Sequence, residues 1–217
     1  MKTLIAVPCM DQVPAQFAQS LAMLEKEGPT SVAFQIGSLI YTSRNNLASM
    51  AIQGGYDYIF WLDSDMMFPP GVLRHMIKTI QSIEDDVILS GVYCRRVAPF
   101  SPTVFSELDL SEGAHWKNIE NVPDEIFECE GFGFGCVLAP TMAFIEVSAK
   151  FGDMFTPING TGEDLSFCWR ARQCGWKLMC DPRIELGHVG HHVITRDFWE
   201  DYRAYAQEEK DDNSSES

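Results

Sequence analysis

Long hydrophobic runs are missing from this sequence. Its 217 residues are 46% hydrophobic, yet no stretch approaches the ~20 consecutive apolar residues that a membrane-spanning helix needs. The apolar segment at the start, Met1 to Pro8, is too short for a secretory signal peptide. We therefore expect a soluble, cytoplasmic protein with no membrane span.

Basic residues are also scarce. The 16 Lys and Arg side chains are outnumbered by 31 Asp and Glu side chains, which gives a formal net charge of −15. This charge opposes binding to nucleic acid or to anionic membrane surfaces. A phosphate-containing ligand would therefore need a local positive group, such as a metal ion or a well-placed arginine.

Cysteine pairs with the spacing of a redox or zinc motif are absent as well. The seven cysteines are odd in number, and none forms a Cys-x-x-Cys pair. Reduced thiols that serve as small core residues in a cytosolic protein fit this pattern best.

The length suits one large α/β domain, which we place at residues 1–207, followed by an acidic tail at 208–217 that we expect to be disordered. In the first half, strands alternate with helices, as in a three-layer α/β/α domain with a mostly parallel central sheet. The expected strands are Thr3–Pro8, Ser31–Ile36, Tyr56–Leu62 and Val87–Tyr93, and the expected helices are Val13–Glu27, one that Ser43 caps and Gly54 ends, and Pro69–Ile83.

The second half has a less regular pattern. Residues 95–128 lack a long period, which predicts loops and short antiparallel strands. Further elements are expected as a strand pair at Ile126–Ala139, a helix at Pro140–Lys150, a helix at Glu163–Cys174 capped by Thr161, short strands at Lys177–Asp181 and Ile184–Val189, and an amphipathic helix around Phe198–Tyr205.

Asp63-Ser64-Asp65 is the most informative motif. It directly follows the buried strand that ends at Leu62, and Pro69-Pro70 then suits the start of a helix. Because ligands of open α/β sheets lie at the carboxyl ends of the strands, two acids at this point indicate a divalent cation with a phosphate ligand. The alternative is an acidic turn that only caps the next helix.

A second acidic cluster, Gly162-Glu163-Asp164, lies at the start of a predicted helix. Thr161 and Asp164 have the spacing of a capping box, so capping is again the alternative. His188 lies between Gly187 and Val189-Gly190, where small neighbours leave room for a ligand, and neutral imidazole is a common metal ligand. The next two histidines, His191 and His192, are interpreted as structural.

Taken in order, these motifs resemble the nucleotide-sugar glycosyltransferases of the GT-A type. The resemblance covers residues 3–192 and is carried by Ser43-Arg44-Asn45-Asn46, Asp63-Ser64-Asp65, a glycine-rich strand, Gly162-Glu163-Asp164 and Gly187-His188-Val189. The first half is most similar to inverting family-two enzymes, including compact ones of phages and large DNA viruses. The stretch 162–190 also resembles mucin-type sugar transferases, which are retaining.

The resemblance implies a metal site made by Asp65, Asp63 and His188. Asp65 would ligate Mn²⁺ or Mg²⁺, Asp63 beside Ser64 would contact the nucleotide ribose or metal-bound waters, and His188 matches the third metal position. One usual feature is not evident, because no acidic residue that could hold the base follows the second strand beyond Gly37-Ser38.

The resemblance also implies where the nucleotide sugar binds. Ala6, Pro8 and Asp11 match the nucleobase pocket, and Arg44 matches a residue near the nucleotide and diphosphate. Gly133 and Gly135 fall where the donor sugar passes close to the backbone. Of the aromatic residues, we expect only Phe132 or Phe134 to lie near the sugar.

For catalysis, Asp164 matches the general base of inverting members, and Glu163 would hold donor or acceptor hydroxyls. The mucin-type enzymes carry an amide where this chain has Asp164, so this departure favours inversion. A carboxylate at a helix start can take the proton of the attacking hydroxyl.

The resulting hypothesis is a hexosyltransferase that moves a sugar from a nucleotide-diphosphate sugar, UDP-linked by family frequency, to a hydroxyl of a glycan or glycoprotein. It would act in the cytoplasm, that of the host if the protein is encoded by a virus. One alternative is a nucleotidyltransferase that makes nucleotide sugars, but Pro8-Cys9-Met10-Asp11-Gln12 lacks the glycine and cation that cradle a triphosphate. The other is a non-catalytic carbohydrate-binding protein. The sequence leaves the donor sugar, the acceptor and the oligomeric state open.

Overall fold

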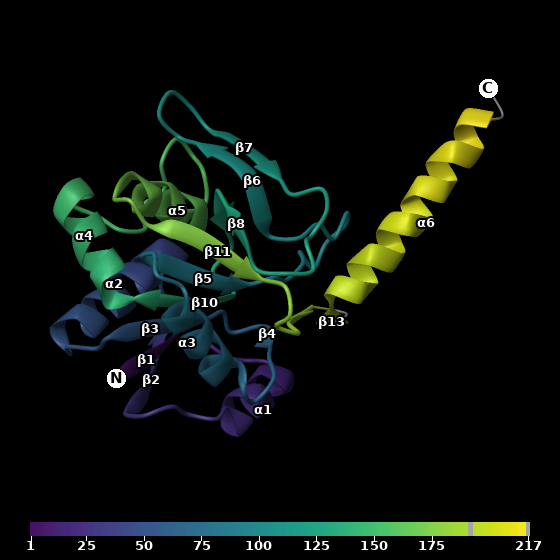
Figure 1. The fold of residues 1–217 in the computed structure, drawn as a ribbon. Helices are drawn as coiled ribbons and strands as arrows, with labels where there is room; N and C mark the ends of the chain where they lie inside the picture. Colours follow the sequence, from purple (N-terminus) through teal and green to yellow (C-terminus); the bar gives the residue numbers. More distant parts are fainter. Residues whose placement is uncertain (191–192, 216–217) are drawn as a thin grey trace.

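A seven-stranded sheet forms the centre of the computed structural model, which describes residues 1–190 and 193–215 (Figure 1). In spatial order, its strands are β2 (Thr30–Ile36), β1 (Thr3–Cys9), β3 (Tyr58–Leu62), β10 (Cys136–Pro140), β5 (Val87–Gly91), β11 (Lys177–Asp181) and β8 (Phe127–Cys129). Five strands run in the same direction, and β10 and β8 run against them. The predicted α/β class with a mostly parallel sheet is therefore confirmed.

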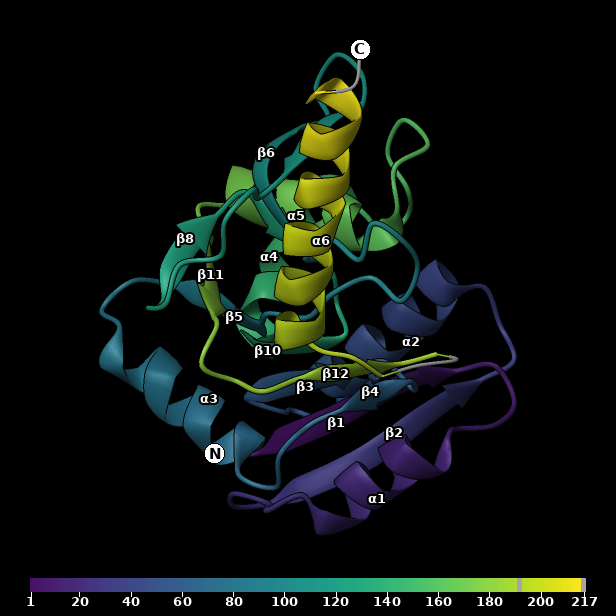
Figure 2. The same ribbon diagram turned by 90° about the vertical axis from the view of Figure 1, so that its right-hand side faces the viewer.

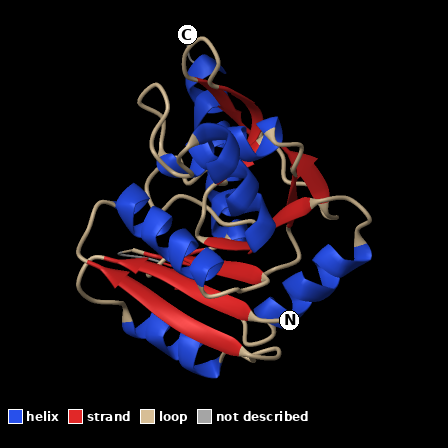
Figure 3. Cartoon of the chain, turned by 90° about the vertical axis from the view of Figure 1, so that its left-hand side faces the viewer, coloured by secondary structure: helices blue, strands red, loops and turns tan. Residues whose placement is uncertain are grey.

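Helices cover both faces of this sheet (Figures 2 and 3). One face packs against α1 (Ala15–Met23) and α3 (Val72–Ser82), and the other packs against α2 (Ile40–Gln53), α4 (Thr141–Phe151) and α5 (Glu163–Gln173). Side chains of β1 alternate between the two cores, because successive residues of a strand point to opposite faces: Ile5 packs on the α1 side and Leu4 on the α2 side. The three-layer architecture is as predicted.

Two expected helix caps are wrong. The helix α2 begins at Ile40, so Ser43 lies within its first turn and does not cap it, although Gly54 follows its last residue as predicted. At the start of α5, Gly162 takes the cap position, and the buried hydroxyl of Thr161 has no hydrogen-bond partner in the described part of the chain.

Two small sheets extend the domain. The first contains β6 (Val104–Asp109), β7 (His115–Asn118) and β9 (Gly131–Phe132), so residues 95–128 do form short antiparallel pieces. The second contains β4 (Met66–Met67), β12 (Gly187–Val189) and β13 (Val193–Ile194). The pairing of β4 with β12 joins the segment after β3 to a segment about 120 residues later.

The last helix, α6 (Arg196–Ser215), extends away from the sheet (Figure 1). Its first turns are anchored by Trp199, which packs with Cys94 and Ile194. The helix continues through residue 215 into the tail that we expected to be disordered, and residues 216–217 lie outside the described residues. Within the described ranges, no helix is long and apolar enough to cross a membrane.

Candidate active site

The two acids of the Asp63-Ser64-Asp65 motif lie at the carboxyl end of β3. The backbone N–H of Asp63 donates to the carbonyl of Gly135, just before β10, and the N–H of Met66 donates back to the carbonyl of Asp63. The chain then enters β4 at Met66. These hydrogen bonds fix the turn that carries both carboxylates at the carboxyl end of the inner strand β3.

His188 reaches Asp65 through the pairing of β12 with β4. The N–H of Val189 donates to the carbonyl of Asp65 over 2.7 Å, and His188 lies opposite Met66. As a result, Nε2 of His188 lies 3.4 Å from Oδ2 of Asp65. The resemblance to GT-A enzymes had implied this meeting of two residues that are far apart in the chain.

A backbone carbonyl orients the imidazole ring of His188. Nδ1–H donates to the carbonyl of Cys94 over 2.9 Å, which leaves Nε2 directed at Asp65, as in histidines that ligate metals. Burial lowers the pKa of His188, but Asp65 outweighs this effect and the pKa is raised. Burial likewise raises the pKa of Asp65, but His188 and Arg96 outweigh it and the pKa is lowered.

Arg96 is a site residue that the sequence analysis missed. Its Nη1 donates to Oδ2 of Asp65 over 2.5 Å and to the carbonyl of Val189 over 3.4 Å, and its side chain is 51% exposed. A signal was present, because Arg95-Arg96 follows shortly after the strand that includes Val87–Gly91, and ligands of such sheets lie at the carboxyl ends of strands.

A cavity of about 360 Å³ opens beside these residues, within the size range of small-molecule sites. It is lined by Pro8, Cys9, Met10, Ser38, Ile40, Ser43, Asp63, Ser64, Asp65, Arg96 and His188. Five of these were predicted site residues: Pro8, Asp63, Ser64, Asp65 and His188. Its wall is mixed, with apolar side chains at the ends of β1 and α2, serine hydroxyls, and two acids next to two basic groups.

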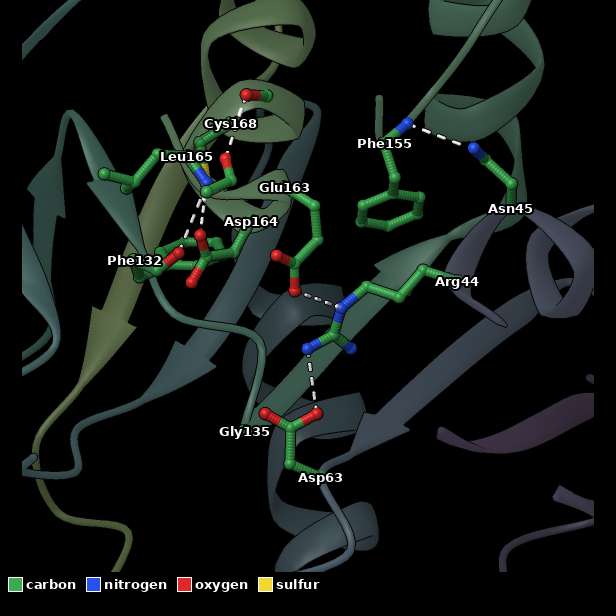
Figure 4. A network of polar contacts seen from close by, with 12 residues as sticks. Arg44, Asn45, Asp63, Phe132, Gly135, Phe155, Glu163, Asp164, Leu165 and Cys168 are labelled. Atoms are coloured by element: carbon green, nitrogen blue, oxygen red, sulfur yellow. Dashed lines mark hydrogen bonds and ion pairs between the residues drawn. The ribbon is translucent and has the colours of Figure 1, made fainter. Parts of the chain in front are cut away.

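Arg44 joins the two acidic motifs (Figure 4). Its Nη2 donates to Oδ1 of Asp63 over 2.8 Å, and its Nε donates to Oε1 of Glu163 over 3.1 Å. The guanidinium is 2% exposed and lies over the rings of Trp61 and Phe134. Arg44 was expected next to the nucleotide, but it is buried and the cavity wall here is formed by Ser43, one residue earlier.

In this bridge, burial and the neighbouring opposite charges have opposing effects on the pKa values of Arg44 and Asp63. Burial lowers the pKa of Arg44, but Asp63 and Glu163 outweigh it and raise the pKa. Burial also raises the pKa of Asp63, against the effect of Arg44. The Nη1 of Arg44 is buried and has no hydrogen-bond partner among the described residues, so one donor of this guanidinium is unused.

Asp164 lies beside this bridge, at the first turn of α5 (Figure 4). Its Oδ1 accepts a hydrogen bond from the N–H of Leu165 over 2.8 Å. Burial, together with the neighbouring Glu163, raises the pKa of Asp164 to about 6. Neither Asp164 nor Glu163 lines the cavity described above, and Glu163 is joined to its wall through Arg44 and Asp63.

Tyr93 occupies the space beside Gly133 and Gly135, where we had expected the donor sugar. Its hydroxyl accepts a hydrogen bond from the N–H of Gly135 over 3.1 Å, and its ring meets His188 edge-on. A Cβ at Gly133 would lie 2.2 Å from the Tyr93 hydroxyl, and one at Gly135 would lie 2.6 Å from its Cζ. These positions are glycines because Tyr93 packs against them.

Four other expected positions do not line the cavity. Ala6 is fully buried on the α2 side of the sheet, because strand alternation turns it into the core. Asp11 is exposed after β1. Phe132 and Phe134 are fully buried in an aromatic cluster, so they present no face to a sugar. The interpretation of His191 and His192 as structural concerns positions outside the described residues.

The pair formed by Asp65 and His188 fits a divalent cation in its chemistry. A carboxylate oxygen and an oriented imidazole nitrogen are ligands that Mn²⁺ accepts. In the described part of the chain, no group of three or more His, Cys, Asp and Glu side chains could hold a metal ion.

Comparisons with known proteins support the fold. No family model and no curated protein matches this chain. Among solved structures, "A197 from STIV" has a TM-score of 0.66 at 14% identity, and the match covers 90% of this chain and 94% of that one. "GalNAc-T7 with UDP, GalNAc and Mn2+" has a TM-score of 0.58 at 11% identity, covering 88% of this chain and 44% of that one. The chain thus has a fold of the GT-A glycosyltransferase type.

Proposed function

We propose that this protein is a metal-dependent glycosyltransferase that moves a sugar from a nucleotide-diphosphate sugar to an acceptor hydroxyl with inversion. The observation that carries the proposal is the 3.4 Å approach of His188 to Asp65 at the edge of a cavity in a GT-A fold. An acidic turn that only capped the next helix would not need an oriented imidazole. It would also not need a cavity.

The cavity suits the nucleotide diphosphate. Pro8, Met10 and Ile40 give it apolar surfaces for a flat base, and the hydroxyls of Ser38 and Ser43 offer polar contacts. Support for UDP comes from the GalNAc-T7 structure, which was solved with UDP and Mn²⁺. A UDP-linked hexose is accordingly our proposed donor.

Asp65 and His188 would hold the cation, Mn²⁺ or Mg²⁺, with Asp63 one residue away on the same turn. When bound, such an ion stabilises negative charge on the departing diphosphate. The contribution of the chain is to position these ligands: Cys94 fixes the His188 ring, and Arg44 fixes Asp63. Positive charge at this point is needed because the chain carries a net charge of −15.

Asp164 is the proposed base. Its pKa of about 6 leaves the carboxylate ionised at pH 7, yet basic enough to accept a proton. The acceptor oxygen would form its bond to the anomeric carbon as the bond to the diphosphate oxygen breaks, and the hydroxyl proton would pass to Asp164. Glu163, held by Arg44, would bind hydroxyls of the donor or the acceptor, which we propose to be a glycan or glycoprotein.

The proposal is tested by a thermal-shift screen of nucleotides and nucleotide sugars with and without Mn²⁺, because a ligand of the native state raises its melting temperature. We expect a diphosphate nucleotide to raise it only when Mn²⁺ is present. Nucleotide release from the stabilising donor would then identify a transferase, whereas pyrophosphate release from a triphosphate would identify a nucleotidyltransferase. Stabilisation by sugars alone, with no nucleotide effect, would overturn the proposal.

A further inference from the structure

Two positively charged or ionisable groups converge on one oxygen of Asp65. Nη1 of Arg96 lies 2.5 Å from Oδ2, and Nε2 of His188 lies 3.4 Å from the same atom. This is the oxygen that faces His188 and that a shared metal ion would use. The guanidinium of Arg96 thus occupies the position of a cation.

We infer that Arg96 is an internal counter-cation that neutralises Asp65 until a divalent ion arrives, and that it then becomes a ligand of the donor diphosphate. The inference rests on the proposed function, because it assigns a role at the same site. It makes Arg96 a residue that couples metal binding to nucleotide binding.

Geometry sets Arg96 and a metal ion in competition. A hard divalent ion binds carboxylate oxygen at about 2.0–2.1 Å, as Mg²⁺ does, so an ion on Oδ2 would lie close to the guanidinium nitrogen that is 2.5 Å from the same oxygen, and the two positive charges would repel each other. Arg96 can leave Asp65, since its side chain is 51% exposed and its other hydrogen bond among the described residues, to the carbonyl of Val189, spans 3.4 Å. His188 remains, held by Cys94.

A diphosphate would give the displaced guanidinium a new partner. Arg96 lines the same cavity as Asp65 and Ser64, and guanidinium groups bind phosphate oxygens in bidentate fashion. A metal ion that binds alone must break the ion pair between Arg96 and Asp65, and Arg96 gains no new partner. When a diphosphate binds together with the metal ion, its phosphate oxygens replace Asp65 as the partner of Arg96. By linkage, Mn²⁺ and the nucleotide then tighten each other's binding by one common factor, to which Arg96 contributes.

The test compares Arg96→Gln with the wild type and with Arg95→Gln. The control removes the same charge one residue earlier, and no described hydrogen bond or ion pair joins Arg95 to Asp65. Mn²⁺ binding is measured from the electron paramagnetic resonance signal of the free ion, with and without UDP. We expect R96Q to bind Mn²⁺ alone about 3–10-fold more tightly, the range of a partly exposed ion pair with a charge-assisted hydrogen bond, and R95Q to match the wild type.

In the presence of UDP, the advantage of R96Q over the wild type in Mn²⁺ affinity should shrink or reverse. The factor by which Mn²⁺ and UDP tighten each other's binding is then smaller in R96Q than in the wild type. If the wild type binds Mn²⁺ with UDP but R96Q binds Mn²⁺ alone no more tightly, the role of Arg96 is overturned while the proposed function stands. If neither protein binds Mn²⁺ under any condition, both the metal-dependent function and this inference are overturned.

Discussion

Arg44 and Glu163 are 119 residues apart in the chain, and Nε of Arg44 donates a hydrogen bond to Oε1 of Glu163 over 3.1 Å. The same guanidinium holds Asp63 on its other side. A cation buried between the two acidic motifs fixes the distance between the turn after β3 and the start of α5. The proposed metal-binding and base-bearing parts of the site are thereby parts of one rigid arrangement.

Removal of Arg44 should destabilise the protein strongly. Arg44→Ala leaves Asp63 and Glu163 close together without their common counter-charge, and loss of one partner of a buried ion pair costs about 3–5 kcal/mol. Arg44→Lys keeps the positive charge but cannot donate to Asp63 and Glu163 at the same time as a guanidinium does, so its free energy of unfolding should lie between those of the wild type and R44A. Urea denaturation measures the free energy of unfolding.

A matched control for this change is Arg74→Ala. Arg74 also bridges two acids, Glu25 and Glu27, but its side chain is 47% exposed, so its removal should change the unfolding midpoint little. Equal losses in R44A and R74A would contradict the view that Arg44 is a buried structural bridge.

The sequence predicted the layers and the motifs better than the contacts between them. Asp63 and Asp65 could be found because they directly follow a buried strand, and ligands of such sheets lie at the carboxyl ends of the strands. His188 could be found from its small neighbours and the chemistry of imidazole. The bridge of Arg44 to Glu163 could not be found, because it depends on how the fold brings the start of α5 to Arg44 on α2, 119 residues earlier in the chain. The packing of Tyr93 against Gly133 was missed for the same reason, since only the fold brings Tyr93 beside it.

Asp164→Asn should lower the transfer rate sharply. An amide cannot accept the acceptor's proton, and general-base assistance contributes about 10²–10⁴ in rate, while donor affinity should remain near that of the wild type. In the wild type, the rate should rise with pH through about 6, where Asp164 ionises, and this rise should be absent from D164N. Steady-state kinetics over a pH series, with donor binding measured by calorimetry, checks both effects.

A suitable control is Asp85→Asn, because Asp85 lies at the opposite, amino-terminal end of β5 and pairs with Lys177 there. D85N should keep the normal rate and its pH dependence. A normal rate in D164N would show that another group is the base.

Asp164→Asn should also change how the free energy of unfolding depends on pH. Burial and Glu163 raise the pKa of Asp164 from 3.8 to about 6 in the folded protein, so the folded state binds the proton more tightly than the unfolded state does. Stability of the wild type should then fall as pH rises from about 4 to 6. D164N lacks this loss and should be more stable above pH 6, by at most about 3 kcal/mol.

This difference should vanish below about pH 4, where Asp164 is protonated in both the folded and the unfolded states. Urea denaturation of both proteins at pH 4, 5, 6, 7 and 8 measures it. A stability difference that does not vary with pH would mean that Asp164 ionises as an ordinary surface acid.

Gly133→Ala should destabilise the fold through Tyr93. The new Cβ would lie 2.2 Å from the Tyr93 hydroxyl, and overpacking of this kind costs about 1–3 kcal/mol. Tyr93→Phe removes that hydroxyl, so G133A should cost less in the Y93F background. A double-mutant cycle by urea denaturation measures the coupling; additive costs would refute the explanation that Tyr93 is why this position is glycine.

Replacement of His188 should abolish the metal dependence of nucleotide binding. His188→Ala removes one of two protein ligands of the proposed ion but leaves Asp65 and Arg96 paired, so Mn²⁺ affinity should fall at least about tenfold, the lower end of losses seen even for residues that only orient ligands. The rise in melting temperature that Mn²⁺ adds to UDP should then disappear. His115→Ala is the control, because His115 is 70% exposed, pairs with Glu107 and does not line the cavity; it should keep the full Mn²⁺ effect. An H188A variant whose melting temperature still rises with Mn²⁺ and UDP as in the wild type would place the ion elsewhere.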